Sequence, residues 1–425
     1  MQFPVDDLRR EFPALERAGE FIFFDNAAGA QVPRCVLDAV TDHLVSRNVQ
    51  RGGPYSRSQE VDAMIARARA AVAAFVNAPS PSEIAFGLNA TSFIRSISLA
   101  VGQTLGDRKD IVVTDLDHEA NVATWLALER FGARVIWWRV RDDGQLYVED
   151  LEPLLSGGTR LVACAAASNA TGSRVDVAAV SKMAHQAGAE VFVDSVHFGP
   201  HGGIDVQAFG CDYLVCSGYK IFSPHMGFAW CRTEAINRLP TFREDFIPDT
   251  TPDKLEAGTY VYENVAGMEA VVGYLERLGS RMGAPAGGSR TATLRTAMNA
   301  IATYEQTLSE GLLDAVLSID GARVHGVSDR ARLSERVPTV SFTVAGVRSG
   351  DIAVDLADHG IGARAGHMYS PRLMRRLQQM PDGLVRVSLV HYNTAAEISR
   401  FKAALATIVA RRRTGQPAAA GRASA

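Results

Sequence analysis

Short apolar runs alternate with helical patterns through the middle of the chain. The runs have the length of strands and carry no charged residue; they are Ile111 to Val113, Val135 to Trp138, Leu161 to Cys164, Val191 to Val193, Tyr213 to Cys216 and Phe228 to Trp230. Strands that are buried on both faces have this composition, and their alternation with helices is typical of a mainly parallel sheet. Helices are predicted from about 34 to 47 and from about 57 to 76. The sequence therefore predicts an α/β fold in which helices cover the sheet.

The length of the chain, 425 residues, favours two domains. A segment rich in glycine and alanine, residues 282–288, separates the α/β part from a block with the pattern of a long helix, a strand pair, a helix, a strand and a final helix. We predict a large α/β domain over residues 18–280 and a smaller α+β domain formed by residues 1–17 and 290–412. Residues 413–425 are small and polar, and we expect them to form a disordered tail.

Composition and charge argue against several classes of function. The formal net charge is −3 with both signs interspersed, so no basic surface for nucleic acid is expected. The first residues do not resemble a signal peptide and no apolar run is long enough to span a bilayer, which predicts a cytoplasmic protein without membrane association. The five cysteines are scattered without a Cys-x-x-Cys pair, so we expect buried free thiols and no metal site.

A carboxylate and an amine each follow one of the predicted strands. Asp194 closes the run that begins at Val191, and Lys220 follows the run that ends at Cys216. Ligands of α/β sheets bind at the carboxyl ends of the strands, so both side chains are expected in one site. A lysine amine forms a Schiff base with the aldehyde of pyridoxal 5'-phosphate, and a carboxylate pairs with its pyridinium nitrogen. Lys220 and Asp194 therefore predict a site for this cofactor.

Several further segments form one pattern by their order and spacing. They are Phe24 to Gln31, Asn89 to Ser92, Asp117 to Asn121, Ser168 to Gly172, Asp194 to Lys220, Glu256 to Thr259, Arg364 to His367 and Arg386 to Thr394. Over nearly the whole chain this pattern resembles the class V aminotransferase family, specifically its cysteine desulfurase-like branch. The resemblance implies a fold type I enzyme that depends on pyridoxal 5'-phosphate, with Lys220, His118 and Asp194 as its catalytic residues.

The resemblance also implies which residues bind the phosphate of the cofactor. Ala90, Thr91 and Ser92 precede a helical pattern, where free backbone N–H groups and the Thr91 hydroxyl would bind an anion. An ordinary helix cap is the simpler explanation of this segment. Ser217 and Tyr219 are implied as further phosphate contacts, although the family usually has histidine at the position of Tyr219.

Other matches surround the cofactor ring and point to a second subunit. His118 matches a histidine that stacks on the pyridine ring. Asn169 and His197 are implied as partners of the ring hydroxyl oxygen, and relatives often carry glutamine at the position of His197. Thr259 resembles a residue that reaches the phosphate of the neighbouring subunit, which implies a homodimer with shared active sites.

Two arginines and one short segment are the expected contacts of the substrate. Arg386 matches the arginine that binds the α-carboxylate of an amino acid, a task suited to a planar guanidinium. Arg364 is expected to assist it, and Asn26 and Ala28 are further predicted substrate contacts. Without the family pattern, a surface ion pair would be the simpler interpretation of either arginine.

The chain departs from the cysteine desulfurases at one position. Those enzymes need a mobile cysteine thiolate, which in the most similar group follows Arg-Ala-Gly-His-His. Here Arg364-Ala365-Gly366-His367-Met368 is followed by Tyr369, and no other cysteine lies in this stretch. Cys216 is predicted inside a strand, where it cannot swing out as a persulfide carrier. Tyr369 is predicted as a wall of the substrate pocket, with a role as proton donor as the alternative.

The remaining machinery can form a ketimine, which weakens a bond at Cβ of the substrate and leaves an enamine when that bond breaks. We expect an enzyme that cleaves a Cβ substituent from a small L-amino acid. The favoured reactions are β-decarboxylation of an aspartate-type substrate, with or without aldol addition to an aldehyde, and C–S β-elimination without a persulfide. A fungal decarboxylative aldolase of peptide natural-product biosynthesis belongs to this broad branch. A true cysteine desulfurase, a class V aminotransferase and a weakly catalytic cofactor-binding partner protein are the alternatives.

Overall fold

A sheet of seven strands forms the centre of the computed structural model, which describes residues 2–414 of the chain. The strands are β2 (Ile84–Gly87), β3 (Asp110–Thr114), β4 (Arg134–Trp138), β5 (Thr159–Ala165), β6 (Glu190–Asp194), β7 (Tyr213–Ser217) and β8 (Gly227–Cys231). Their order is β2-β8-β7-β6-β5-β3-β4, and the pairs from β7 to β4 are parallel, whereas β8 is antiparallel to both of its neighbours. The predicted mainly parallel sheet is confirmed.

Helices cover both faces of this sheet because successive side chains of each strand point to opposite faces. Ile111 and Val113 of β3 belong to one apolar core, which they share with α5 (Ala90–Gly102) and α6 (Ala120–Leu126). Val112 belongs to a second core on the other face. The helices that contribute to this second core include α3 (Arg34–Ser46), α4 (Ser56–Phe75), α7 (Val177–Gln186), α8 (Val206–Phe209) and α10 (Tyr262–Arg281). The short helix α9 (Thr233–Asn237) follows β8.

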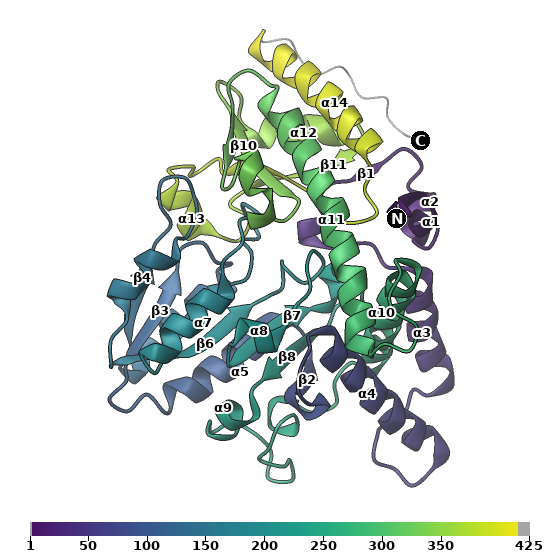
Figure 1. Cartoon of the computed structure of the whole chain (residues 1–425), viewed down its shortest axis with the longest axis vertical. Helices are drawn as coiled ribbons and strands as arrows, with labels where there is room; N and C mark the ends of the chain where they lie inside the picture. Colours follow the sequence, from purple (N-terminus) through teal and green to yellow (C-terminus); the bar gives the residue numbers. More distant parts are fainter. Residues whose placement is uncertain (1, 415–425) are drawn as a thin grey trace.

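The C-terminal part of the chain forms a separate antiparallel sheet with its own core. Its strands are β9 (Ala322–His325), β10 (Thr339–Val344), β12 (Arg364–Gly366) and β13 (Leu384–Ser388), in the order β12-β13-β10-β9. Its helices are α11 (Arg290–Leu317), α12 (Ser349–Asp358), α13 (Pro371–Arg376) and α14 (Ala395–Arg413). Helix α11 is long and contacts both this sheet and the helices of the larger one (Figure 1).

The N-terminal residues pack against this C-terminal part. The first helices are α1 (Val5–Arg9) and α2 (Pro13–Arg17), and β1 (Ile22–Phe23) then pairs in parallel with β11 (Ile361–Gly362). This pairing brings the segment after β1 beside β13, as shown by the hydrogen bond from the Ser388 N–H to the Phe24 carbonyl at 2.7 Å. The boundaries that we predict for the two domains stay a prediction.

Two elements differ from the sequence-based expectation. Strand β2 was not predicted, because four residues at the edge of a sheet carry too short a pattern. Helix α14 extends through Arg413, where the predicted tail was to begin. Arg412 hydrogen-bonds both carboxylate oxygens of the buried Asp355 at 2.7 Å, so this charged helix end is ion-paired and not simply solvated. Residues 415–425 of the predicted tail lie outside the described residues.

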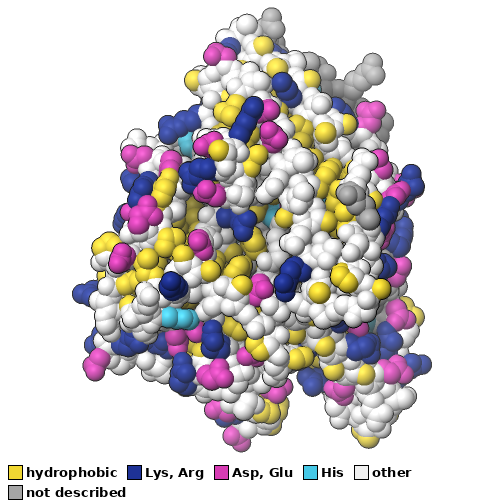
Figure 2. All heavy atoms as spheres, viewed as in Figure 1, with side chains coloured by type: hydrophobic (Ala, Val, Ile, Leu, Met, Phe, Trp, Pro, Cys, Tyr) yellow, Lys and Arg dark blue, Asp and Glu magenta, His cyan; other side chains and the backbone are white. Residues whose placement is uncertain are grey.

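The surface carries both signs of charge. Figure 2 shows Lys and Arg side chains interspersed with Asp and Glu side chains over the visible face. Within residues 2–414, no helix is long and apolar enough to cross a membrane. All five cysteines are free thiols; Cys35 is partly exposed and the other four are buried.

Candidate active site

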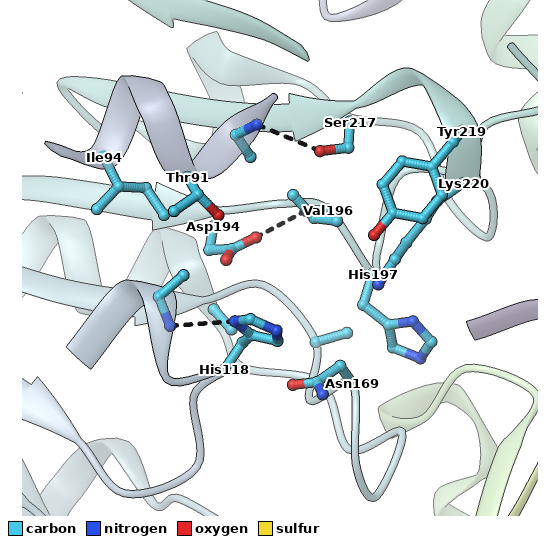
Figure 3. Close-up of a pocket in the computed structure, with 14 residues that line it drawn as sticks. Thr91, Ile94, His118, Asn169, Asp194, Val196, His197, Ser217, Tyr219 and Lys220 are labelled. Atoms are coloured by element: carbon cyan, nitrogen blue, oxygen red, sulfur yellow. Dashed lines mark hydrogen bonds between the residues drawn. The ribbon is translucent and has the colours of Figure 1, made fainter. Parts of the chain in front are cut away.

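A cavity lies at the carboxyl ends of β5, β6 and β7, the position at which α/β sheets bind ligands. It is lined by Ala90, Thr91, Ile94, His118, Ala120, Ala165, Ala167, Asn169, Asp194, Val196, His197, Ser217, Tyr219 and Lys220 (Figure 3). All predicted cofactor contacts except Ser92 and Thr259 are among these residues. The fold therefore brings together side chains that are separated by up to 130 positions in the sequence, from Ala90 to Lys220.

Lys220 provides a buried amine in this cavity. It ends the 3-10 turn Gly218–Lys220 that follows β7. Burial, with the positive charge of Arg386, lowers the pKa of Lys220 to about 8, although the negative charge of Asp194 opposes this shift. Near neutral pH a useful fraction of the amine is therefore unprotonated, and this is the form that attacks an aldehyde.

Asp194 provides a buried carboxylate at the end of β6. Its Oδ1 accepts the backbone N–H of Val196 at 2.9 Å, which fixes the orientation of the side chain. Burial raises the pKa of Asp194, while the hydrogen bond from Val196 and the charge of Lys220 oppose the rise. A cation brought into the cavity, such as a protonated ring nitrogen, would stabilise this carboxylate as an ion pair.

His118 presents a neutral imidazole to the same cavity. Its Nδ1 accepts the backbone N–H of Ala120 at 3.1 Å, so the ring is held in place and its hydrogen lies on Nε2. Burial, with the charges of Lys220 and Arg386, lowers the pKa of His118 to about 4. Figure 3 shows the ring facing the space next to Asp194. The arrangement suits a ring that stacks on a flat aromatic ligand.

The first turn of α5 borders the cavity where the phosphate is expected. The Ala90 N–H lies 3.4 Å from Ser217 Oγ, and Thr91 lines the cavity directly. Ser92 does not line it, because its N–H donates to Asn89 Oδ1 at 2.9 Å and its hydroxyl donates to the Asn89 carbonyl at 2.7 Å. Asn89 is thus an N-cap, and the phosphate contacts of Ala90, Thr91 and Ser217 stay a prediction.

Tyr219 and Thr259, the two remaining predicted phosphate contacts, have different surroundings. The Tyr219 ring lines the cavity and stacks on His225 with ring centroids 4.9 Å apart. Thr259 is exposed and lies away from the cavity, where its Oγ1 accepts from Gln50 Nε2 at 3.1 Å. Within one chain, Thr259 therefore does not line the cavity, and its predicted contact with the phosphate of a neighbouring subunit stays a prediction.

Arg386 and Arg364 share one carboxylate that the sequence analysis did not single out. Arg386 is buried on β13 and donates through Nη2 to Asp25 Oδ1 at 2.8 Å and through Nη1 to the Asn169 carbonyl at 2.8 Å. Arg364 donates through Nε to Asp25 Oδ2 at 2.9 Å. The two guanidinium groups are thus held in place by Asp25. Asp25 stands directly before Asn26 in the segment Phe24 to Gln31, which resembles the family, and this position was the sequence signal that could have identified it.

Asn26 and Ala28, the other predicted substrate contacts, are occupied by structural bonds. The Asn26 amide donates to the Phe23 carbonyl at 2.7 Å and to the Ser388 carbonyl at 2.9 Å, and its oxygen accepts from the Tyr392 hydroxyl. The Ala28 N–H donates to the Asp25 carbonyl at 2.9 Å. These bonds give Asn26 a structural role, and the predicted substrate contacts of Asn26 and Ala28 stay a prediction. Asn26 joins the N-terminal segment to β13.

The loop that carries Tyr369 is held on both sides. The Glu119 N–H donates to the Tyr369 carbonyl at 2.8 Å, and Arg372 holds the Glu119 carboxylate with two bonds of 3.1 and 2.9 Å. On the other side, Asn169 Nδ2 donates to the Met368 carbonyl at 2.6 Å. Met368 and Tyr369 have φ values of 51° and 58°, in the left-handed region that favours glycine. The Tyr369 side chain is 57% exposed, and its ring lies 5.7 Å from that of His118.

The residues present fit the predicted cofactor. The cavity combines a buried amine, a buried carboxylate and a neutral imidazole face with the first turn of a helix. One buried polar atom of its wall, His197 Nδ1, has no hydrogen-bond partner among residues 2–414, as expected where a ligand oxygen is to be bound.

Comparison with known proteins defines the class. A family model described as aminotransferase class-V matches residues 22–401. The chain therefore belongs to the class-V aminotransferase family, and it is a fold type I enzyme that uses pyridoxal 5'-phosphate, as predicted.

The similar proteins include one that is named aminotransferase-like and others that are named cysteine desulfurase. The chain is 34% identical to the aminotransferase-like protein FGM3 of Gibberella zeae over 96% of its own length and 99% of that protein. It is 31% identical to the cysteine desulfurase of an Enterobacter species, over 96% and 99% of the two chains. Among solved structures, the cysteine desulfurase of Thermococcus onnurineus NA1 matches with a TM-score of 0.85 at 26% identity, covering 96% of this chain and 99% of that one. The desulfurase CsdA of Escherichia coli matches with a TM-score of 0.82 at 26% identity, over 98% and 100%.

Proposed function

We propose that this enzyme cleaves a substituent at Cβ of a small L-amino acid without the help of a protein thiol. The observation that carries the proposal is the loop around Tyr369. Residues 364–371, where the related desulfurases are expected to carry their mobile cysteine, contain no cysteine. Hydrogen bonds from Glu119 and Asn169 also tether this loop through the carbonyls of Tyr369 and Met368.

The favoured reaction is loss of the β-carboxylate from an aspartate-type substrate. Such a reaction releases CO₂ and leaves a nucleophilic carbon, which takes a proton to give alanine or attacks an aldehyde to give a hydroxylated amino acid. The bound cofactor supplies the electron sink. We assign to Lys220 the transfer of the proton from Cα once the substrate amine has replaced it, and to Asp194 the charge that keeps the ring nitrogen protonated.

The charges around Arg386 support a substrate with one anchored carboxylate. Arg386 and Arg364 carry two positive charges and share the single negative charge of Asp25, so one positive charge remains for the α-carboxylate. In this proposal the β-carboxylate lies beyond the Arg386–Asp25 pair, toward His118 and Tyr369, and does not bind Arg386. A carboxylate that is not paired with a cation is lost more readily as CO₂, which favours decarboxylation.

Product analysis by mass spectrometry tests the proposal. The cofactor-loaded protein is incubated separately with L-aspartate and with L-cysteine, each with and without an aldehyde. Alanine or an aldol product from aspartate supports β-decarboxylation. Sulfide and pyruvate from cysteine alone would instead assign the protein to the C–S β-lyases, a reaction that likewise needs no loop thiol. A persulfide on the protein would contradict the proposal.

Two alternative functions would give different changes in the absorbance of the bound cofactor. An aminotransferase converts the bound cofactor stoichiometrically to its aminated form, and a keto acid reverses the change. A partner protein that merely binds the cofactor would show no spectral change with any amino acid. The relative named aminotransferase-like keeps the first alternative open, whereas the full set of Lys220, Asp194 and His118 in one cavity, with Arg386 paired beside it, argues against the second.

We propose further that two copies of the chain form a homodimer. Thr259 and its partner Gln50 lie on the surface and do not reach the cavity of their own chain. Tyr55 and Leu88, with exposed fractions of 50% and 62%, are apolar groups that a second subunit would cover. A mass of one chain in solution by light scattering would contradict this proposal.

A further inference from the structure

His197 has one ring nitrogen bonded and one ring nitrogen free. The side chain is buried in the segment after β6 and lines the same cavity as Lys220. Its Nε2 lies 3.0 Å from Thr339 Oγ1, at the start of β10 in the C-terminal sheet. Its Nδ1 is buried and has no hydrogen-bond partner in the part of the chain that the structure describes. Figure 3 shows the ring on the Lys220 side of the cavity.

Asn169, the other residue predicted to bind the ring oxygen of the cofactor, already makes two hydrogen bonds through its side chain. Its Nδ2 donates to the Met368 carbonyl at 2.6 Å, and its Oδ1 accepts from the Ser370 hydroxyl at 3.2 Å. The loop around Tyr369 thus uses the Asn169 oxygen and one of the two N–H groups of its amide, so one N–H remains. His197 Nδ1 is the atom of the pair that is buried without a hydrogen-bond partner within residues 2–414, and it is available to a ligand oxygen beside Lys220.

The surroundings of His197 keep its ring neutral, with a single N–H. Burial lowers the pKa of His197 well below its usual range, and the charges of His201, Lys220 and Arg386 act in the same direction. The His201 ring lies 5.4 Å from the His197 ring and is bonded through Nδ1 to Glu305 of α11 at 2.9 Å. These are the charged and titratable groups that face His197 from the neighbouring elements.

The Thr339 hydroxyl determines which nitrogen carries that hydrogen. Its only hydrogen bond within residues 2–414 is the one to His197. If Thr339 accepted from Nε2, its own O–H would remain buried without an acceptor, which costs free energy. If the Thr339 hydroxyl instead donates to Nε2, both the hydroxyl and Nε2 are hydrogen-bonded, and the hydrogen of His197 lies on Nδ1.

We propose that Thr339 is a positioning residue that holds the hydrogen of His197 on Nδ1, from which His197 donates it to the phenolic oxygen of the cofactor bound to Lys220. The hydroxyl of pyridoxal 5'-phosphate is on the ring carbon next to the carbon that bears the aldehyde, so this oxygen comes near the lysine nitrogen. A donor on the Lys220 side of the cavity is placed to meet it. The inference rests on the cofactor site of the proposed function, and it does not depend on which Cβ bond is cleaved.

The donor has a measurable consequence in the protein without substrate. A hydrogen bond to the phenolate stabilises its negative charge and so lowers the pH at which the proton on the Lys220-linked nitrogen is lost. Removing the donor should raise this pH by about one to two units, the size expected of a hydrogen bond to a charged group.

The test is a pH titration of the absorbance of the holoenzyme, with no amino acid present. His197→Leu should raise the midpoint by about one unit or more, and His197→Gln, which keeps an amide donor, should return it toward the wild-type value. Thr339→Val should raise it in the same direction by about half a unit, and Thr339→Ser should restore it. Thr339→Ala, with a smaller side chain, serves as a second variant without the hydroxyl.

Thr343→Val is the matched control. Thr343 Oγ1 lies 3.2 Å from Nε2 of the buried His325, so this pair resembles Thr339 and His197 but lies outside the cavity. An unshifted midpoint in both Thr339→Val and Thr339→Ala, equal to that of Thr343→Val, would overturn the proposal. Because no substrate is used, this result is independent of the product analysis that tests the reaction.

Discussion

The buried Arg386 and the partly buried Asp25 form an ion pair, with Arg386 Nη2 2.8 Å from Asp25 Oδ1. Asp25 Oδ2 holds Arg364 on its other side at 2.8 Å. The guanidinium that we expect to bind the substrate is therefore oriented before substrate arrives. A substrate carboxylate has to share Arg386 with Asp25 and the Asn169 carbonyl, and the Nε–H of Arg386 has no hydrogen-bond partner within residues 2–414.

Arg386→Lys should weaken substrate binding strongly. A lysine cannot hold Asp25 and a substrate carboxylate with a planar fork of donors, so the apparent KM should rise by about 10- to 100-fold, with a smaller change in kcat. Absorbance changes on titration with the amino acid measure the binding. Arg364→Lys, at a half-exposed position, should have a smaller effect. Equal effects of the two substitutions would contradict the assignment.

Capture of the cofactor should depend on pH through Lys220. Because burial lowers the pKa of this amine to about 8, it is mostly protonated and unreactive below that pH. The rate at which the cofactor-free protein takes up the cofactor should therefore rise as the pH increases toward and beyond 8. Stopped-flow absorbance measures it. Lys220→Ala should lose the absorbance band, while the exposed Lys182→Ala should retain it.

Asp194→Asn should keep the cofactor bound but slow the reaction. The amide oxygen can still accept the Val196 N–H, so the local structure is retained. The negative charge that stabilises a protonated ring nitrogen is lost, and turnover should fall by about 10²-fold or more. Steady-state kinetics of the cofactor-loaded variant measure this. A variant with wild-type turnover would show that the charge of Asp194 is not needed.

Tyr369→Phe distinguishes a wall of the pocket from a proton donor. As a wall, Tyr369 acts through its ring near His118, and removal of the hydroxyl should change kcat little. Loss of a proton donor would instead reduce kcat by about 10²-fold or more. Tyr369→Cys should not create a persulfide-forming enzyme, because the loop stays bonded to Glu119 and Asn169. Mass spectrometry of the variant after treatment with L-cysteine checks this point.

Glu256→Ala should destabilise the fold. Glu256 holds Arg69 with bonds of 2.7 and 3.1 Å and accepts the Phe86 N–H of β2 at 2.8 Å. Its loss leaves the Arg69 charge unpaired in the interior, at a cost of about 3–5 kcal/mol in the free energy of unfolding. Urea unfolding measures it. Glu60→Ala, which breaks the exposed pair with Arg57, should cost less than about 1 kcal/mol.

Much of the large sheet was predictable because its signals are local. A run such as Tyr213 to Cys216 reports burial on both faces without knowledge of its neighbours, and it is strand β7. Strand β2 was not predictable in this way, since its four residues acquire their role only from pairing with β8. The same holds for the end of α14, where Asp355 stabilises arginines that look solvated in the sequence.

The sequence by itself determined the class of the protein and the main groups of its site. Lys220 and Asp194 follow apolar strands, and the order of strands in an α/β sheet makes their meeting predictable. Only the tertiary structure decided which polar groups remain free. Asn26 is occupied by residues more than 360 positions away, whereas Thr339 leaves Nδ1 of His197 unpaired. A hydrogen bond depends on the distance and direction between two side chains, and these are set by the packing of distant segments rather than by any local pattern.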